Sequence, residues 1–182
     1  ALDMMEMAKK SMVPPFEISV FPDPAGSFTT AAAMVACTEK TLKDRFKSNF
    51  KDKNIIIYGG KGIVGGISAV MCAKEGAKCN IIGYDGIENV RKKADEYKSR
   101  FGVEIQPSDG SSDKLNESYL HDAEIIFCAA RAGTEVISKD QLNLSKKALI
   151  LADVNAVPPA GLGGVNLNDD NSKHPCGALS IG

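Results

Sequence analysis

Hydrophobic residues in this chain fall into short continuous runs that alternate with longer segments of helical spacing. The runs do not alternate between apolar and polar positions, which is typical of strands buried on both faces of a parallel sheet. We expect strands at 54–58, 78–83, 103–106, 124–129 and 147–152, and helices at about 63–75, 86–101, 111–120 and 137–142. Strands that alternate with helices predict an α/β fold with a doubly wound parallel sheet and flanking helices.

The first fifty residues follow a different pattern. A short helix at about 2–12 and a long helix at 29–46 enclose the stretch PPFEISVF, residues 14–21, which predicts an N-terminal strand. A turn-rich loop, PDPAGSF, follows this strand. The chain starts at Ala1 rather than Met and stops in the small-residue run GALSIG, so we expect a fragment of a longer polypeptide.

The most informative stretch is NIIIYGGKGIVGG, where residues 59–66 contain five glycines directly after a stiff apolar run. Residues 60–65 fit the pattern G-x-G-x-x-G between a strand and an amphipathic helix. In a Rossmann-type domain the three glycines permit a tight turn, a close approach of pyrophosphate and close helix–strand packing. The helix start offers free N–H groups to the phosphates. A turn without a ligand is the alternative. The residues expected to contact a dinucleotide are Gly60, Lys61, Gly62, Ile63, Val64 and Gly65.

The type of dinucleotide depends on the end of the next strand. Asp85 lies twenty residues after Gly65, preceded by Tyr84, where such folds often place an acid that binds the adenosine ribose hydroxyls. An acid there favours NAD and repels the 2′-phosphate of NADP. Asp85 with Glu88 also resembles a helix capping box, and the basic residues 91–93 could tolerate a phosphate. We therefore expect NAD, with NADP or the use of both as alternatives.

Composition excludes several classes of protein. The net charge is −1, from 22 basic and 23 acidic residues, so no excess positive field exists for nucleic acid. No apolar run reaches the roughly 18 residues of a membrane span. None of the five cysteines is paired at metal-ligand spacing, and four lie among apolar neighbours. These features predict buried, reduced thiols in a cytoplasmic protein without a metal site. We expect His121 and His174 in surface loops, without a catalytic role.

Three more stretches make the chain recognisable: GSFTTAAAMVA (26–36), ADVNAVPPAGLGGV (152–165) and GALSIG (177–182). With GGKGIVGG and KEGAKCNIIGYD, they give a sequence that resembles the NAD(P)-dependent methylene-tetrahydromethanopterin dehydrogenases of methylotrophic bacteria. That family also includes users of methylene-tetrahydrofolate. The resemblance runs from about residue 14 to residue 182, and the D-x-N-A-x-P-P-x-G-x-G-G element is its most specific part.

The resemblance implies an activity and a division into domains. The activity is hydride transfer from methylene-tetrahydromethanopterin, or methylene-tetrahydrofolate, to NAD(P), which gives the methenyl form in one-carbon metabolism. The implied partners are a small-molecule pterin and further copies of the chain in a homo-oligomer. Residues 1–48 would be a remnant of a pterin-binding domain with its linking helix, and residues 49–182 the dinucleotide-binding domain. The lysine that the family uses in catalysis would lie beyond Gly182, so the catalytic residue is unknown.

Further site residues follow from the fold and the resemblance. Ligands bind at the carboxyl ends of parallel strands. That places Ala129, Ala130 and Arg131 near the cofactor ribose and pyrophosphate, and Asp153 and Asn155 near the nicotinamide or the pterin. A surface role for Arg131 and a turn role for Asn155 are the alternatives. The resemblance also implies pterin contacts, for which helix capping near residue 23 is the alternative. The candidates are Asp23, Thr29, Thr30 and Pro159.

The proposed chemistry makes few demands on side chains. Oxidation of a methylene group between two nitrogens releases a hydride and leaves an amidinium cation that the nitrogen lone pairs stabilise. No proton leaves in that step, so the protein mainly has to hold the carbon near the nicotinamide. Two other readings stay open: another dehydrogenase on this scaffold, of shikimate or folate type, or a dinucleotide-binding module without catalysis.

Overall fold

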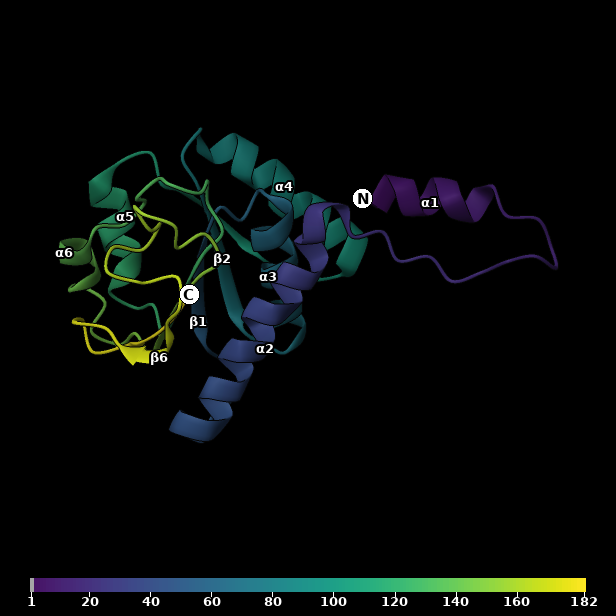
Figure 1. The fold of residues 1–182 in the computed structure, drawn as a ribbon. Coiled ribbons are helices and arrows are strands. Elements are labelled where there is room, and N and C mark those ends of the chain that lie inside the picture. The colour runs from purple at the N-terminus through teal and green to yellow at the C-terminus, as the bar shows by residue number, and fades with distance from the viewer. Residues whose placement is uncertain (1) are drawn as a thin grey trace.

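A seven-stranded sheet forms the centre of the computed structural model, which describes residues 2–182 (Figure 1). The strands are β1 (Asn54–Tyr58), β2 (Lys78–Gly83), β3 (Gln106–Asp109), β4 (Ile125–Cys128), β5 (Ile150–Asp153), β6 (Asp170–Lys173) and β7 (Leu179–Ile181). Their order is β3-β2-β1-β4-β5-β7-β6, and all neighbours are parallel except β6, which runs antiparallel to β7. The predicted α/β class and doubly wound sheet are confirmed.

Helices cover both faces of this sheet (Figure 1). The helices α2 (Ser27–Phe46), α3 (Ile63–Lys74) and α4 (Ile87–Phe101) enclose one half of the core with Ile55 and Ile57. On the other face, α5 (Asp113–Leu120) and α6 (Lys139–Leu142) pack over Ile56 and Ile82. Strand β1 therefore contributes alternate side chains to two separate cores. This explains why its sequence is apolar at consecutive positions rather than at every second one.

The N-terminal region departs from the prediction. Helix α1 (Leu2–Lys10) and the extended segment after it reach away from the body of the molecule, before the short 3₁₀ helix η1 (Pro24–Gly26) leads into α2 (Figure 1). The strand predicted at 14–21 is wrong: Pro14 and Pro15 lie in a turn, and residues 16–21 make no ladder with another described segment. Pro14 and Pro15 have no N–H to donate, and a strand needs a neighbour. The proposed domain boundary near residue 48 stays a prediction, although α2 packs on α3.

Strand pairing shifts other elements relative to the hydrophobic pattern. The strand expected at 103–106 is observed as β3, which begins at Gln106. Val103 and Ile105 are buried, but they precede the paired residues. Strands β6 and β7 were not predicted, because β6 is polar and largely exposed and β7 has three residues. Of the helices that the structure describes, none combines the length and the apolar character needed to cross a bilayer.

The cysteines are less uniformly buried than expected. Cys72, Cys79 and Cys128 are buried in the cores, whereas Cys37 is exposed on α2 and Cys176 is partly exposed. Burial raises the pKa of Cys79 and of Cys128 to about 12, so both thiols stay protonated at neutral pH. The prediction of four buried thiols is therefore correct for three.

Candidate functional site

The glycine loop joins the end of β1 to the start of α3, at the carboxyl edge of the sheet. Gly59 has a φ of +78°, and a Cβ there would lie 2.4 Å from the Ala129 carbonyl oxygen. A Cβ on Gly65 would lie 2.6 Å from the Gly59 carbonyl oxygen, which confirms the close helix–strand packing predicted for the third glycine. The tight turn predicted at Gly60 is confirmed, because the Gly62 N–H donates to the Gly59 carbonyl oxygen at 2.9 Å, and Gly59 supplies the positive φ. Only a residue without a side chain fits either position.

The start of α3 is open to solvent. Its N-cap is Gly62, and within residues 2–182 no side chain caps it. Gly62 is exposed, and so is the next residue, Ile63, with 46% of its surface accessible. The first N–H groups of a helix need acceptors, and here they face outward beside an apolar side chain. This combination fits a ligand that carries both a phosphate and an apolar surface.

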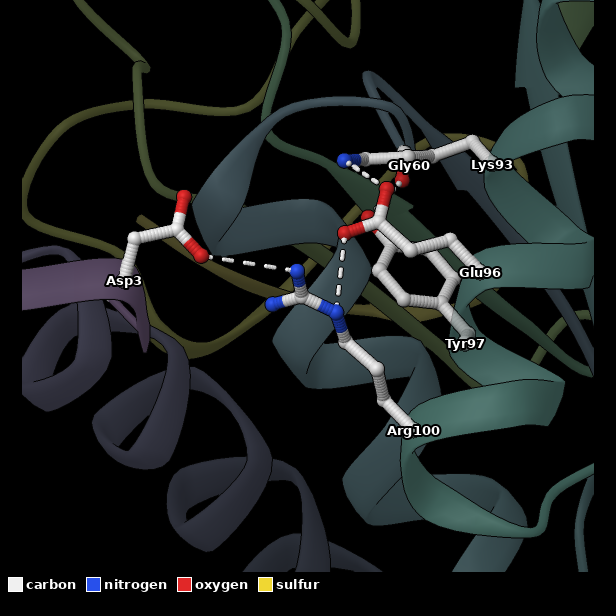
Figure 2. A network of polar contacts seen from close by, with 6 residues as sticks. All are labelled: Asp3, Gly60, Lys93, Glu96, Tyr97 and Arg100. Atoms are coloured by element: carbon white, nitrogen blue, oxygen red, sulfur yellow. Dashed lines mark hydrogen bonds and ion pairs between the residues drawn. The ribbon is translucent and has the colours of Figure 1, made fainter. Parts of the chain in front are cut away.

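Tyr97 on α4 fixes the loop from below (Figure 2). Its ring is buried, and its hydroxyl donates a hydrogen bond of 3.1 Å to the Gly60 carbonyl oxygen. A Cβ on Gly66 would lie 1.8 Å from this hydroxyl oxygen, so only glycine at this position lets the start of α3 lie against Tyr97. Sequence reasoning missed Tyr97. The helical spacing of Tyr97 with Val90 and Ala94 indicates a place on the buried face of α4. The spacing does not indicate which atom accepts the hydrogen bond from the Tyr97 hydroxyl.

Charged residues surround a small cavity beside the loop. Glu96 accepts from Lys93 at 2.7 Å and from Arg100 at 3.4 Å, and Arg100 also reaches Asp3 on α1 at 3.6 Å (Figure 2). The cavity has a volume of about 200 Å³. Its lining includes Lys61, Gly62 and Ile63 from the glycine loop and Phe28 from α2. The start of α2 therefore lies next to the loop.

Asp85 lies at the end of β2 and pairs with a residue of the glycine loop. The Lys61 ammonium contacts the Asp85 carboxylate and lies 5.9 Å from the centre of the exposed Tyr84 ring. The hydrogen bond from Lys61 lowers the pKa of Asp85, so this carboxyl is ionised at neutral pH. The structure therefore brings together Lys61, Tyr84 and Asp85, as expected for one end of a dinucleotide site.

Two alternatives to a cofactor contact of Asp85 were a helix capping box and a phosphate site at residues 91–93. The capping box is wrong, because the N-cap of α4 is Gly86 and, in the described chain, no side chain caps it. In the basic group at 91–93, Arg91 pairs with Glu88 and Lys93 with Glu96. Lys61 is the cation that lies against Asp85.

The loops after β4 and β5 are tied to each other. Asp153 is buried and accepts the backbone N–H groups of Asn155 and Leu162, both at 2.9 Å. Burial raises the pKa of Asp153, although these N–H groups oppose the shift. The Asn155 side-chain amide donates to the Ala130 carbonyl oxygen. Both polar side chains therefore hold loops in place. For Asn155 this is the turn role that was given as the alternative to a cofactor contact.

Small residues lie where these loops meet the glycine loop. The Ala129 N–H donates to the Tyr58 carbonyl oxygen at 2.9 Å, and Ala129 and Ala130 are both half-buried. Arg131 is exposed, in agreement with the surface alternative. The cofactor contacts predicted for these residues, and for Asp153 and Asn155, stay predictions.

The predicted substrate residues lie in two separate segments. Asp23 accepts the Phe28 N–H at 2.7 Å and the Thr29 hydroxyl at 2.6 Å, and the Thr29 hydrogen bond lowers the pKa of Asp23. These are helix-capping contacts at the start of α2, near the partly buried Thr30. Pro159 is exposed in the loop after β5. Among the residues described, no cluster of three or more His, Cys, Asp and Glu side chains could hold a metal ion.

His174 contradicts the sequence-based expectation. It is 4% exposed, and its ring nitrogens contact the Gly163 carbonyl oxygen and the Cys176 sulfur. The expectation of a surface loop failed because the partner segment, 158–165, lies apart in sequence. His121 is exposed at the end of α5, as expected.

Known proteins are similar to this chain in sequence and in fold. No family model matches the chain. The chain is 44% identical, over its whole length and 63% of the relative, to the NAD(P)-dependent methylenetetrahydromethanopterin dehydrogenase of Methylorubrum extorquens. It is 32% identical, over 98% of its length and 62% of the relative, to the bifunctional protein MdtA of the same organism. The resemblance inferred from the sequence is thus confirmed, and the chain spans less than two thirds of either relative.

Solved structures confirm the fold class alone. An L-alanine dehydrogenase superposes on 86% of the chain, and on 45% of its own length, with a TM-score of 0.64 and 16% identity. At this identity the likeness shows a shared Rossmann-type architecture.

Proposed function

We propose that this chain is the dinucleotide-binding part of an NAD(P)-dependent dehydrogenase that oxidises methylene-tetrahydromethanopterin, or methylene-tetrahydrofolate, to the methenyl form. The observation that carries the proposal is the 44% identity to the M. extorquens dehydrogenase along the whole chain. The open start of α3 beside a glycine loop supports it from the side of the structure.

The site fits a dinucleotide at both of its ends. The exposed Gly62 and the first N–H groups of α3 would hold the pyrophosphate. Asp85 would accept hydrogen bonds from the adenosine ribose hydroxyls, which favours NAD. Lys61, paired with Asp85, would supply a positive charge near the additional phosphate of NADP. We therefore propose NAD as the preferred cofactor and NADP as a weaker one.

At the nicotinamide end of the site, the residues would hold the reactants in position and would take no part in bond changes. When bound, the nicotinamide ring supplies the acceptor for a hydride. The half-buried Ala129 and Ala130 would leave space for the ribose and pyrophosphate, and Asn155, which holds the Ala130 backbone through its amide, would lie near the nicotinamide. Because hydride loss from a carbon between two nitrogens gives a stabilised cation, no proton has to be taken up by a side chain. Positioning is then the main contribution of the protein.

A fluorescence titration of the chain with NADH and NADPH tests the cofactor assignment. We expect NADH to bind more tightly than NADPH. Gly62→Ala tests the position of the pyrophosphate, because Gly62 is exposed at the start of α3 and the protein atom near an added Cβ is the Gly59 carbonyl oxygen, at 3.2 Å. We expect the added methyl group to hinder the approach of the phosphate and to lower the affinity about tenfold, with little change in thermal unfolding. Absence of binding by the unaltered chain would overturn the assignment.

Turnover tests the substrate. The chain is mixed with NAD and each methylene-pterin, and reduced nicotinamide is followed by its absorbance. Turnover of one pterin supports the proposed reaction. Tight NADH binding without turnover of either would limit the chain to the dinucleotide-binding role, and the pterin contacts would then belong to the part of the relatives that this chain does not span.

A further inference from the structure

His174 and Cys176 lie in the tight turn between β6 and β7, which two backbone hydrogen bonds of 2.9 Å close. The His174 Nε2 atom lies 2.9 Å from the Gly163 carbonyl oxygen. A carbonyl oxygen can only accept, so Nε2 carries the hydrogen and Nδ1 is the basic nitrogen of the ring. This Nδ1 accepts the Cys176 N–H at 3.2 Å and lies 3.0 Å from the Cys176 sulfur. The geometry thus points the basic nitrogen at the thiol.

The arrangement is that of an activated nucleophile. A thiol lies within hydrogen-bond reach of a base, and a third group orients the base. Here the third group is the Gly163 carbonyl, which would also stabilise a protonated ring through its bond to Nε2. His174 is 4% exposed, so its ring is held in place, whereas Cys176 is partly exposed at the border of the second core. Among residues 2–182, Cys176 is the cysteine paired with a histidine.

We propose that Cys176 is a nucleophilic thiol that His174 activates, and that it is a site of covalent modification by soft carbon electrophiles such as activated alkenes. The Cys176 sulfur forms a bond to the β-carbon of the alkene, and the thiol proton moves to His174 Nδ1. The π electrons of the alkene move to its α-carbon, which then takes a proton from the imidazolium. The product is a thioether, the histidine is regenerated, and no oxidant or reductant takes part.

Alkylation rates of individual cysteines test this proposal. The full chain is treated with limiting N-ethylmaleimide at neutral pH, and adducts are quantified by peptide mass spectrometry over time. Cys37 is the internal reference, because it is more exposed than Cys176. We expect Cys176 to react about tenfold faster than Cys37, since the base at hand removes the need for a free thiolate. A rate at Cys176 that does not exceed that of Cys37 would overturn the proposal.

His174→Gln separates activation from structure. Glutamine keeps an N–H donor for the Gly163 carbonyl but has no basic nitrogen for the thiol. We expect the rate at Cys176 to fall to that of Cys37 or below, with the Cys37 rate unchanged and Cys72 still protected. An undiminished rate at Cys176 would contradict the role of His174.

The unaltered chain gives a second test, which holds even if the variant does not fold. An ordinary thiol reacts about tenfold more slowly for each pH unit below its titration range. We expect a shallower pH dependence at Cys176 than at Cys37 between pH 6 and pH 8. Equal slopes would also overturn the proposal.

Discussion

Lys61 and Asp85 form the contact on which cofactor choice depends in the proposed site. One belongs to the glycine loop and the other to the end of β2, so the pair joins two parts of the expected binding surface. An acid alone would exclude a 2′-phosphate, but an acid that already has a cation beside it excludes the phosphate less strongly.

Asp85→Asn is expected to reverse the preference. The amide keeps the shape but loses the charge, so NADH should lose about tenfold in affinity, as for one charge-assisted hydrogen bond. NADPH should gain, because Lys61 becomes available to its phosphate. Parallel titrations of both cofactors measure the ratio. An equal change in both affinities would show that Asp85 acts only through the position of Lys61.

Tyr97→Phe tests whether the hydroxyl fixes the glycine loop. The variant leaves the buried Gly60 carbonyl without this partner, so we expect a loss of about 1 kcal/mol in unfolding free energy and weaker NADH binding. Tyr119→Phe is the matched control, since its hydroxyl donates to the Asp109 carbonyl oxygen at 3.0 Å. The control should lose similar stability in denaturant unfolding but keep its NADH affinity. If both variants bind NADH normally, Tyr97 has no positioning role.

These residues show what can be read from one sequence. The close packing of the glycine loop and the place of Asp85 beside it were predictable, because both follow from the spacing of these residues after a buried strand. The contact of Asp85 with a ribose stays a prediction. Tyr97 and His174 were not, because their partners are backbone carbonyls 37 and 11 residues away. The sequence alone does not indicate which distant backbone carbonyl will accept a hydrogen bond from a given side chain.

At the scale of elements, the hydrophobic pattern located the inner strands well. The predicted ranges 54–58 and 78–83 match β1 and β2, because these strands are buried on both faces. The pattern failed for β3 and β6, whose residues are polar and whose pairing depends on backbone hydrogen bonds alone. A strand at the rim of a sheet needs little apolar surface, so hydrophobicity does not locate it.

Gly59→Ala should disrupt the junction between β1 and α3. The variant combines a positive φ with a Cβ 2.4 Å from the Ala129 carbonyl oxygen. Gly133→Ala is the control, because Gly133 also has a positive φ, of +73°, but no atom within 4 Å of the added Cβ. We expect a loss of about 1 kcal/mol for the control and about 3 kcal/mol for Gly59→Ala. Equal losses in urea unfolding would show that the loop can move away from Ala129.

A pH-dependent contact joins the starts of β1 and β4. Glu124 accepts from Lys53 at 2.8 Å and from the Asn54 N–H at 3.0 Å. Partial burial works to raise the pKa of Glu124, but these two contacts outweigh it and hold that pKa below its usual value. A carboxyl with a lowered folded-state pKa stabilises the fold above its unfolded pKa, and this contribution is lost as pH falls through the folded value.

Glu124→Gln should therefore cost about 1 kcal/mol of unfolding free energy at pH 7. The difference from the unaltered chain should shrink as pH falls below about 4.3, the ordinary pKa of glutamate. Urea unfolding at several pH values measures it. Asp122→Asn is the control, because its partner Lys147 and Asp122 are both largely exposed, and it should have little effect. A pH-independent difference would contradict the role of the charge.

At the scale of the whole molecule, the N-terminal arm, residues 11–23, is the least covered part of the structure. It carries three large apolar side chains with exposed fractions of 81%, 75% and 72%, at Phe16, Ile18 and Phe21. Side chains of this kind in an extended segment mark a surface that other protein covers. This agrees with the expected homo-oligomer, which stays a prediction.

Phe16→Ser combined with Ile18→Ser should reduce self-association. Neither side chain belongs to the two cores, so we expect thermal unfolding of the body to be unchanged. Sedimentation velocity over a range of concentrations measures the association, and Val157→Ser, at a 38% exposed site outside the arm, is the control. If the unaltered chain associates and the double variant sediments identically, another surface carries the association. If neither associates, the arm does not mediate self-association of this chain.

The two outermost strands of the sheet bear on how copies of this chain avoid aggregation. At one border β3 contains Pro107, which has no N–H to offer to a further strand. At the other, β6 reads Asp-Asn-Ser-Lys, and its pairing with β7 is irregular between Asp170 and Ser172. Prolines, charges and bulges at sheet borders oppose the edge-to-edge stacking that leads to fibrils. Both borders of the seven-stranded sheet carry such features, so we expect copies of this chain to resist edge-to-edge stacking.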